Sequence, residues 1–215
     1  NRIPEQHIGE EQSFNEIQRL EQTLVATRRQ IQEVQRRVTS SLGPQEAGIF
    51  DAHLLVLEDP TVIEEVTRKI MTDKVSAEYA FQQVTDRYIR GLTAIEDEYL
   101  RERAADVRDV ATRILNNLLG RDHEVDLQRL IEPCIIVSHD LSPSQTAQLD
   151  KKLVLGFATD MGSQTSHTAI MARSLRIPAV VGLRNATLEL HSGQYVLLDG
   201  FNGAMPLAAN KISGI

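Results

Sequence analysis

The sequence has a single cysteine, no long apolar run and no block of basic residues. One cysteine, Cys134, excludes an internal disulfide and suits a reducing cytosol. Because no apolar run is long enough to cross a bilayer and no signal peptide is visible, we expect a cytoplasmic protein without a membrane partner. Lys and Arg number 23 against 30 Asp and Glu, a net charge of −7, which argues against nucleic acid as a partner.

Several catalytic patterns are also absent. A zinc site needs His or Cys ligands at short spacing, whereas the six histidines of this chain are scattered. Neither a Gly-x-Ser-x-Gly nor a Walker A pattern occurs, and adjacent residues such as Ser166 and His167 do not form a hydrolase pair. We therefore expect no metal site in this chain, no P-loop and no serine-hydrolase triad.

No acidic residue occurs from Met161 to Arg184, whereas this window contains the basic residues Arg173 and Arg176. In a chain that is acidic as a whole, such a window around one histidine, His167, suggests an anionic ligand. The window is also rich in hydroxyl residues close to this histidine.

The residues around His167 have the pattern of a strand, a tight turn and the start of a helix. The apolar run 153–158 predicts a buried strand, and Gly162 allows a turn after it. Apolar residues at helical spacing then predict a helix that begins near His167. There the imidazole stays neutral and nucleophilic, beside backbone N–H groups that bind anions. The alternative is a helix cap with a structural, hydrogen-bonded histidine.

The spacing of apolar residues differs between the two halves of the chain. Apolar residues recur at helical spacing through residues 10–120, which predicts an antiparallel helical bundle. Short β-type runs then follow, with helices between them, and this half predicts a compact α/β domain. The β-type runs are 134–137, 153–158, 179–181 and 195–198, and the helices are expected near 143–149 and 167–175. The chain opens at Asn1 rather than Met, so we expect a fragment of a longer protein.

The stretch around His167 resembles the phosphohistidine signature of enzyme I of the bacterial phosphoenolpyruvate:sugar phosphotransferase system. Seven residues fit the pattern of that family: Gly162, Thr165, Ser166, His167, Thr168, Ala172 and Arg173. Ser163 departs from it, because a second small residue, usually glycine, is expected there. This departure removes no chemical group.

The resemblance extends through most of both halves. Residues 98–109 are very close to a run in enzyme I helical domains, and 140–149 resemble the segment before the second strand. Residues 49–59 resemble the helix that docks the small carrier protein HPr. The family usually opens with a strand containing Ala-Ser-Pro-Gly, which is not found here, so the sheet either lacks a strand or takes it from residues 3–8.

The resemblance implies an α+β, two-domain fold in which an antiparallel helical bundle is inserted in a swivelling α/β phosphohistidine domain. Residues 10–120 would form the HPr-binding helical domain, and residues 1–9 and 121–215 the swivelling domain. The implied activity is that of a phosphoenolpyruvate-protein phosphotransferase, a transferase whose His167 passes the phosphoryl group to a histidine of HPr. Phosphoenolpyruvate and Mg²⁺ are expected on a C-terminal domain that this chain lacks. The intact parent is expected to be a homodimer.

The site residues that the resemblance implies fall into two sets. The catalytic set is His167, Thr165 and Arg173, with Thr165 holding the imidazole and Arg173 offsetting charge. The partner-binding set lies near the end of the docking helix: Asp51, His53, Leu54, Leu55, Leu57, Glu58 and Asp59. Outside these sets, His139 beside Asp140 at a strand end favours a turn-stabilising pair over a catalytic dyad. A half-buried surface histidine is the alternative for His53.

Two alternatives to free enzyme I stay open at this point. The first is an enzyme I-like domain within a multiphosphoryl protein, such as the dihydroxyacetone type, with a different acceptor. The second is a non-catalytic helical interaction module in which the histidine is structural. The sequence does not define the downstream sugar.

Overall fold

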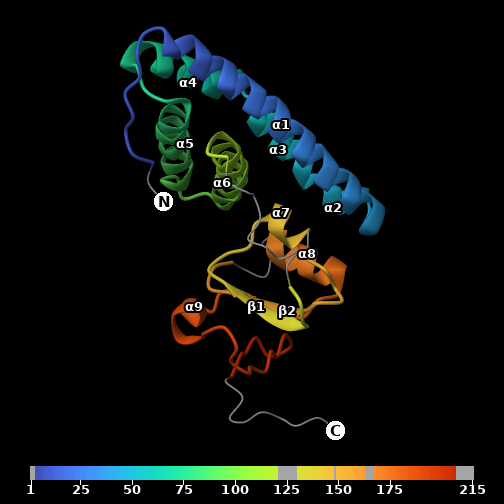
Figure 1. Ribbon diagram of the computed structural model, residues 1–215. Coiled ribbons are helices and arrows are strands. Elements are labelled where there is room, and N and C mark those ends of the chain that lie inside the picture. The colour runs from blue at the N-terminus through green and yellow to red at the C-terminus, as the bar shows by residue number, and fades with distance from the viewer. Residues whose placement is uncertain (1–2, 121–129, 148, 163–166, 207–215) are drawn as a thin grey trace. The chain divides into compact units, whose positions relative to one another are not determined.

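The computed structural model describes residues 3–120, 130–147, 149–162 and 167–206. The chain divides into two compact units, Asn1–His123 and Glu124–Ile215, called here the helical unit and the α/β unit. The first is built from helices and the second contains a small parallel sheet (Figure 1). The predicted α+β class is therefore confirmed.

Turn residues separate the six helices of the helical unit. Gly43 has a φ of 113°, which glycine adopts without strain, and Pro44 starts the next helix. Asp59 caps the helix that Pro60 begins, because its side chain accepts a hydrogen bond from the N–H of Thr61. The helices are α1 Gln12–Ser41, α2 Pro44–Ala47, α3 Ile49–Leu57, α4 Pro60–Asp73, α5 Ala77–Thr93 and α6 Glu98–Leu118.

The core of the helical unit follows the apolar stripes of these helices, with polar residues at one interface. Fully or almost fully buried side chains include Leu20, Ile31, Phe50, Val66, Ile70, Ala80, Phe81, Ala104, Val110 and Ile114. On α1 the stripe includes the buried Thr27, whose hydroxyl accepts a hydrogen bond from Asn117 of α6 (2.8 Å). Asn117 also pairs with the amide of Gln30. This satisfied polar link fixes α1 against α6.

The described part of the N-terminal segment, residues 3–9, packs on the helical unit, whereas residues 1–9 were expected in the α/β domain. The N–H of Ile8 donates to the carbonyl of Lys74 (2.8 Å), and the N–H of Ser76 donates to the carbonyl of Gln6 (3.0 Å). The link between α4 and α5 has backbone groups that no helix satisfies, and this segment pairs with them.

The α/β unit has a three-stranded parallel sheet with the order β1-β2-β3. Its strands are β1 Cys134–Ser138, β2 Val154–Thr159 and β3 Ala179–Val180, and its helices are α7 Pro143–Thr146, α8 His167–Leu175 and α9 Ala186–Glu189. Phe157 of β2 lies opposite Ile136 of β1 and Ala179 of β3, and it is fully buried. Met171 and Leu175 of α8 are also buried.

The expected fourth strand at 195–198 is not a strand among the described residues. Its backbone groups bond to the segment that follows, since Leu197 N–H donates to Pro206 and Asp199 exchanges hydrogen bonds with Ala204. Leu198 instead packs over β2, where a Cβ on Gly156 would lie 2.4 Å from its Cδ2 atom. The apolar run is therefore present, but it packs across the sheet instead of extending it.

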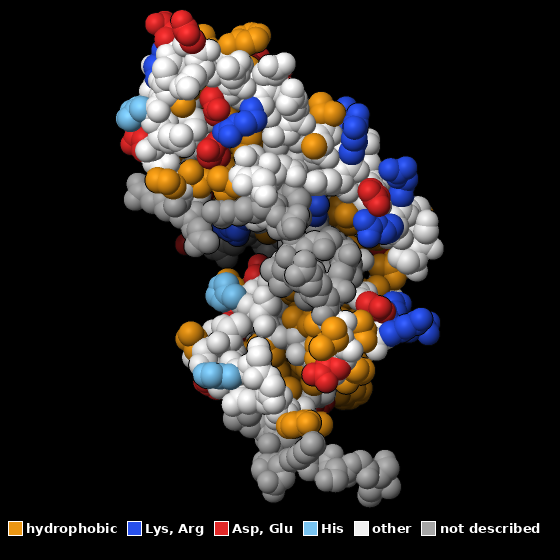
Figure 2. All heavy atoms as spheres, in the orientation of Figure 1, with side chains coloured by type: hydrophobic (Ala, Val, Ile, Leu, Met, Phe, Trp, Pro, Cys, Tyr) orange, Lys and Arg blue, Asp and Glu red, His pale blue; other side chains and the backbone are white. Residues whose placement is uncertain are grey.

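Both units expose charged and apolar side chains, and the helical unit exposes Phe14 and Leu55 among the latter. Charged side chains of both signs are mixed over the helical unit in Figure 2. The α/β unit carries exposed apolar side chains, including Leu155, Leu197 and Phe201. No helix within the described residues combines the length and apolar character needed to span a membrane.

Candidate functional site

Loops from two neighbouring strands meet at the carboxyl edge of the sheet in the α/β unit. His139 follows β1 and Asp160 follows β2, and the N–H of Met161 donates to the carbonyl of His139 (3.0 Å). Gly162 then turns the chain with a φ of 107°. A Cβ on Gly182 would lie 3.1 Å from the carbonyl oxygen of Gly162, so the chain approaches closely here. The glycine turn expected after the second strand is present.

Helix α8 begins at His167, as the sequence predicts. In its first turn the hydroxyl of Thr168 donates to the carbonyl of Leu141 (2.6 Å), which fixes the helix start to the loop after β1. This turn contains no acidic residue, so no carboxylate of the turn opposes an anion at the positive end of the helix. Thr165, Ser166 and the side chain of His167 lie outside the described residues, and the roles expected of them stay predictions.

Arg173 lies in the last turn of α8, six residues after His167. Six residues of α-helix correspond to a rise of about 9 Å. The exposed side chain lines a hollow of about 840 Å³ whose other walls come from residues 177–181 and 197–203. A cation in the last turn suits the helix dipole, so Arg173 also has a structural role.

His139 and Asp160 form a pair that the sequence did not predict. The Nδ1 atom of His139 lies 3.4 Å from Oδ2 of Asp160, and Asp160 is 3 % exposed. The hydroxyl and N–H of Thr187, in α9, also donate to this carboxylate. These hydrogen bonds, first that from the Thr187 hydroxyl, lower the pKa of Asp160. The expected turn-stabilising partner, Asp140, instead accepts a hydrogen bond from the N–H of Leu141.

The signal for this pair was available in the sequence. His139 and Asp160 each come directly after a predicted strand, and the ends of adjacent parallel strands lie at one edge of the sheet. The strand order decides whether two such residues meet, and the β1-β2 pairing brings them together.

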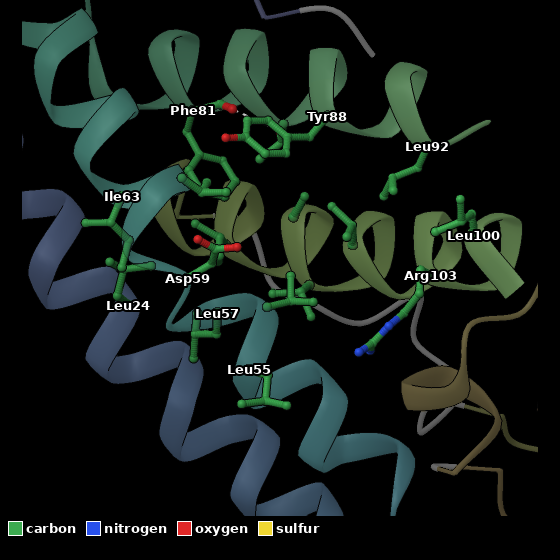
Figure 3. Close-up of a pocket in the computed structure, with 17 residues that line it drawn as sticks. Leu24, Leu55, Leu57, Asp59, Ile63, Phe81, Tyr88, Leu92, Leu100 and Arg103 are labelled. Carbon is green, nitrogen blue, oxygen red and sulfur yellow. Dashed lines mark hydrogen bonds between the residues drawn. The ribbon is translucent and has the colours of Figure 1, made fainter. Parts of the chain in front are cut away.

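The helical unit contains an apolar cavity of about 380 Å³ between α3, α5 and α6 (Figure 3). Leu55 and Leu57 of α3 line it together with Tyr88 of α5 and Arg103 of α6. Leu55 is 67 % exposed, so an apolar side chain is available at the surface beside the cavity. An opening of this kind suits an apolar side chain from another molecule.

His53 and Leu57, expected in the partner-binding set, are buried, with exposures of 1 % and 4 %. The Nε2 atom of His53 lies 3.5 Å from Oδ1 of Asp106, and Nδ1 lies 3.8 Å from Oδ2 of Asp109. The imidazole also contacts Phe50 edge-to-face, with 5.4 Å between ring centroids. The helix turns His53 toward α6, so its side chain supports the surface from below; Leu57 forms a cavity wall.

The other expected partner residues are more accessible, and several already have partners. Asp51 is exposed and accepts a hydrogen bond from Gln35 (2.7 Å), while Glu58 pairs with Arg28 at 3.1 Å. Asp59 is half-buried and caps α4, and Leu54 is also half-buried. Of the three acidic residues, Asp59 lines the cavity with Leu55, while Asp51 and Glu58 lie four residues before and three residues after Leu55 in the chain.

Comparison with known proteins matches both units. The family model described as PEP-utilising enzyme, N-terminal, matches residues 2–103, and that described as PEP-utilising enzyme, mobile domain, matches residues 130–203. The solution structure of an enzyme I protein (nEIt) has 42% sequence identity and a TM-score of 0.74. The match covers 97% of this chain and 84% of that one. This chain belongs to the enzyme I family.

Further relatives agree with this membership. Phosphoenolpyruvate-protein phosphotransferase of Geobacillus stearothermophilus is 45% identical over 189 residues, which are 87% of this chain and 32% of the relative. The protein of the same name from Bacillus subtilis is 43% identical over 87% of this chain and 33% of the relative. The N-terminal domain of an Enzyme 1 - Nitrogen protein has 25% identity and a TM-score of 0.62, over 95% of this chain and 82% of that one. The chain thus spans about a third of these curated enzyme I relatives.

Proposed function

We propose that His167 accepts a phosphoryl group from phosphoenolpyruvate held on a domain outside this chain and passes it to a histidine of HPr. The observation that carries this proposal is that α8 begins at His167, with an acid-free first turn, in a chain of the enzyme I family. The α/β unit is then the swivelling phosphohistidine domain, and the helical unit is the domain that docks HPr.

The chemistry proposed for His167 is in-line transfer to and from its Nε2 atom. Such transfer depends on positioning and on offsetting the charge of the moving oxygens. The N–H groups of the first turn of α8 offset part of that charge, and their position is fixed by the hydrogen bond from Thr168 to Leu141. Thr165 would hold the unphosphorylated ring, and Arg173 would contact the phosphoryl group.

The Mg²⁺ ion expected in this family is assigned to the domain outside the chain. Among the described residues, no group of three or more His, Cys, Asp or Glu side chains is arranged to hold a metal. Asp160 is bonded to Thr187, and Asp199 accepts hydrogen bonds from Phe201 and Asn202. These residues do not fit a Mg²⁺ site, and the role proposed for this chain uses none.

His167→Gln tests the phosphoryl-carrying residue. Incubated with phospho-HPr, the unchanged chain should gain one acid-labile phosphoryl group, which peptide mapping at alkaline pH locates on His167. The glutamine variant should lose this catalysed uptake and keep its helical circular dichroism. His191→Gln, an exposed histidine in the same unit, is the matched control and should label normally. If phospho-HPr labels His167 neither in the unchanged chain nor in the His191→Gln control, the result would support the non-catalytic alternative.

The docking surface proposed for HPr is the cavity beside Leu55 with its acidic rim of Asp51, Glu58 and Asp59. HPr-type carriers present a basic, partly apolar surface around their histidine, which complements an apolar patch with acidic residues beside it. The exposed Leu55 is the proposed anchor, because apolar side chains that enter a pocket dominate binding energy.

Leu55→Ser should weaken HPr binding by on the order of tenfold or more, because it removes an anchor worth about 1.4 kcal/mol or more. Titration calorimetry or chemical-shift mapping measures this change. Val25→Ser is the matched control, since Val25 is 52 % exposed on α1 and does not line the cavity. Shift changes confined to the α/β unit would contradict the proposed surface.

A further inference from the structure

His139 has the surroundings of an activated nucleophile, although the transfer proposed for His167 does not use it. Its Nδ1 atom lies 3.4 Å from Oδ2 of Asp160, while 72% of its side chain is exposed. The two nitrogens lie on different sides of an imidazole ring. With Nδ1 directed at the carboxylate, Nε2 therefore points away from Asp160, toward the exposed side of the ring.

The carboxylate behind His139 is fixed. The side chain of Asp160 is 1% exposed, and it accepts hydrogen bonds from both the hydroxyl and the N–H of Thr187. These bonds lower the pKa of Asp160, so it is ionised at neutral pH. An ionised acceptor holds the Nδ1–H tautomer, which leaves the lone pair on Nε2. Activated catalytic side chains share this arrangement, in which a fixed neighbouring group orients the reacting side chain.

One element bonded to the loop of His139, the start of α8, can attract an anionic reactant. The start of α8, whose first turn lacks acids, is bonded through Thr168 to Leu141, two residues after His139. Asp140, the acid next to His139, is engaged with the N–H of Leu141 at 2.9 Å. The N–H groups at a helix start attract phosphoryl oxygens.

We propose that Nε2 of His139 is a second phosphoryl-accepting atom, which reacts with small donors that carry an N–P bond, such as phosphoramidate. The Nε2 lone pair forms the new bond to phosphorus, and the N–P bond of the donor breaks with its electron pair returning to the donor nitrogen. The Nδ1 proton stays in place, and the positive ring charge that develops faces Asp160. This site is independent of the role proposed for His167.

The chain contains a matched internal control in His7. Its side chain is 73% exposed, and its Nε2 atom lies 3.6 Å from a carboxylate, that of Glu5. Glu5, however, is 52% exposed, and its carboxylate faces Nε2 itself. His7 and His139 are thus equally accessible, but only His139 of this pair has a buried carboxylate behind Nδ1.

The experiment treats the full chain with phosphoramidate at neutral pH and maps each phosphohistidine by peptide mass spectrometry at alkaline pH over time. His139 should label on the order of tenfold faster than His7, the advantage expected of one charge-assisted hydrogen bond. In Asp160→Asn the rate at His139 should fall to that of His7, while His7 itself is unchanged. ³¹P spectra should show the Nε2 isomer at residue 139.

Equal rates at His139 and His7 in the unchanged chain would overturn the proposal, and this comparison needs no variant to fold. Phosphorylation of Nδ1 of His139 would overturn it as well. Labelling of residue 167 is recorded in the same spectra, so failure at residue 139 leaves the function proposed for His167 untouched. If His139 is labelled and His167 is not, the result would count against the function proposed for His167 instead.

Discussion

His53 links a surface helix to its neighbour in the helical unit. The ring lies between Asp106 and Asp109, whose side chains are 7% and 11% exposed. Neither Nε2 of His53 nor Oδ2 of Asp109 has a hydrogen-bond partner, so packing and charge hold the contact. Burial lowers the pKa of the Arg113 guanidinium, and the charge of Asp109 opposes this shift. His53 is thus one member of a buried polar group beneath the proposed docking surface.

Replacing His53 with Ala should destabilise the chain by about 3 kcal/mol, because it removes a fully buried side chain that packs against Phe50 and opens a cavity. Urea unfolding followed by circular dichroism measures this change. Asp51→Ala, an exposed position on the same helix, is the control and should change the free energy of unfolding by about 0.5 kcal/mol or less. Equal effects of the two substitutions would show that the buried group contributes nothing.

For individual residues, the sequence predicts the helix or strand to which a residue belongs better than the residues that it contacts. The helical period placed His53 on α3, but the packing of α6 determines that it faces Asp106. His139 was expected to pair with its neighbour Asp140, yet it meets Asp160, which is 21 residues away. Short-range patterns do not encode such contacts, because they depend on which strands and helices become neighbours.

The helix starts differ in how they are capped. Asp97 caps α6, since its side chain accepts a hydrogen bond from the N–H of Leu100 (3.0 Å). Ser76 precedes α5, but its side chain makes no capping bond, and its buried hydroxyl has no partner. Because α6 supplies Arg103 to the cavity and Asp106 to His53, its start matters for the proposed docking surface.

Asp97→Ala should lower the free energy of unfolding by about 1 kcal/mol, the usual cost of losing a side-chain cap. Thermal or urea unfolding measures the loss. Ser76→Ala is the matched control at the start of α5 and should be close to neutral, because no capping bond is removed. A larger effect at Ser76 than at Asp97 would refute this assignment of the caps.

The longer helices and the first three strands could be predicted because strong periods and turn residues define them locally, whereas the four-residue helices α2 and α9 were not expected. The helix of 30 residues at α1 and the helix start at His167 both follow from such patterns. The conformation of the run at 195–198 could not be predicted in the same way. Its composition fits a strand, but its hydrogen bonds go to Ala204 and Pro206, which is a matter of tertiary pairing.

On the scale of the whole molecule, each of the two units matches its own family model. The resemblance to enzyme I found the family from short motifs, and it implied that residues 1–9 belong to the α/β domain, whereas Ile3, Gln6 and Ile8 hydrogen-bond to the helical unit. Those residues are outside the motifs, and their place depends on the unsatisfied backbone at the link between α4 and α5. The sequence thus predicts the family better than it predicts how an unpatterned segment packs.

The described part of the chain offers a histidine at a helix start and the cavity proposed as a docking surface, but it has no metal-holding group of three or more side chains. Phosphoenolpyruvate bound through Mg²⁺ normally requires carboxylates that hold the ion beside the phosphate. The chain also spans about a third of its curated relatives. We therefore expect the two phosphoryl donors to act differently on it.

Phospho-HPr should label His167 of the isolated chain reversibly, whereas phosphoenolpyruvate with Mg²⁺ should not label it. The transfer between histidines needs only the docking surface and the helix start, while transfer from phosphoenolpyruvate needs the site assigned to a domain outside the chain. Intact-mass spectra after incubation with each donor measure this, with components free of intact enzyme I. Adding unlabelled HPr to the labelled chain should then remove the phosphoryl group. Labelling by phosphoenolpyruvate alone would mean that the chain itself contains a complete substrate site, which would contradict the proposed division between domains.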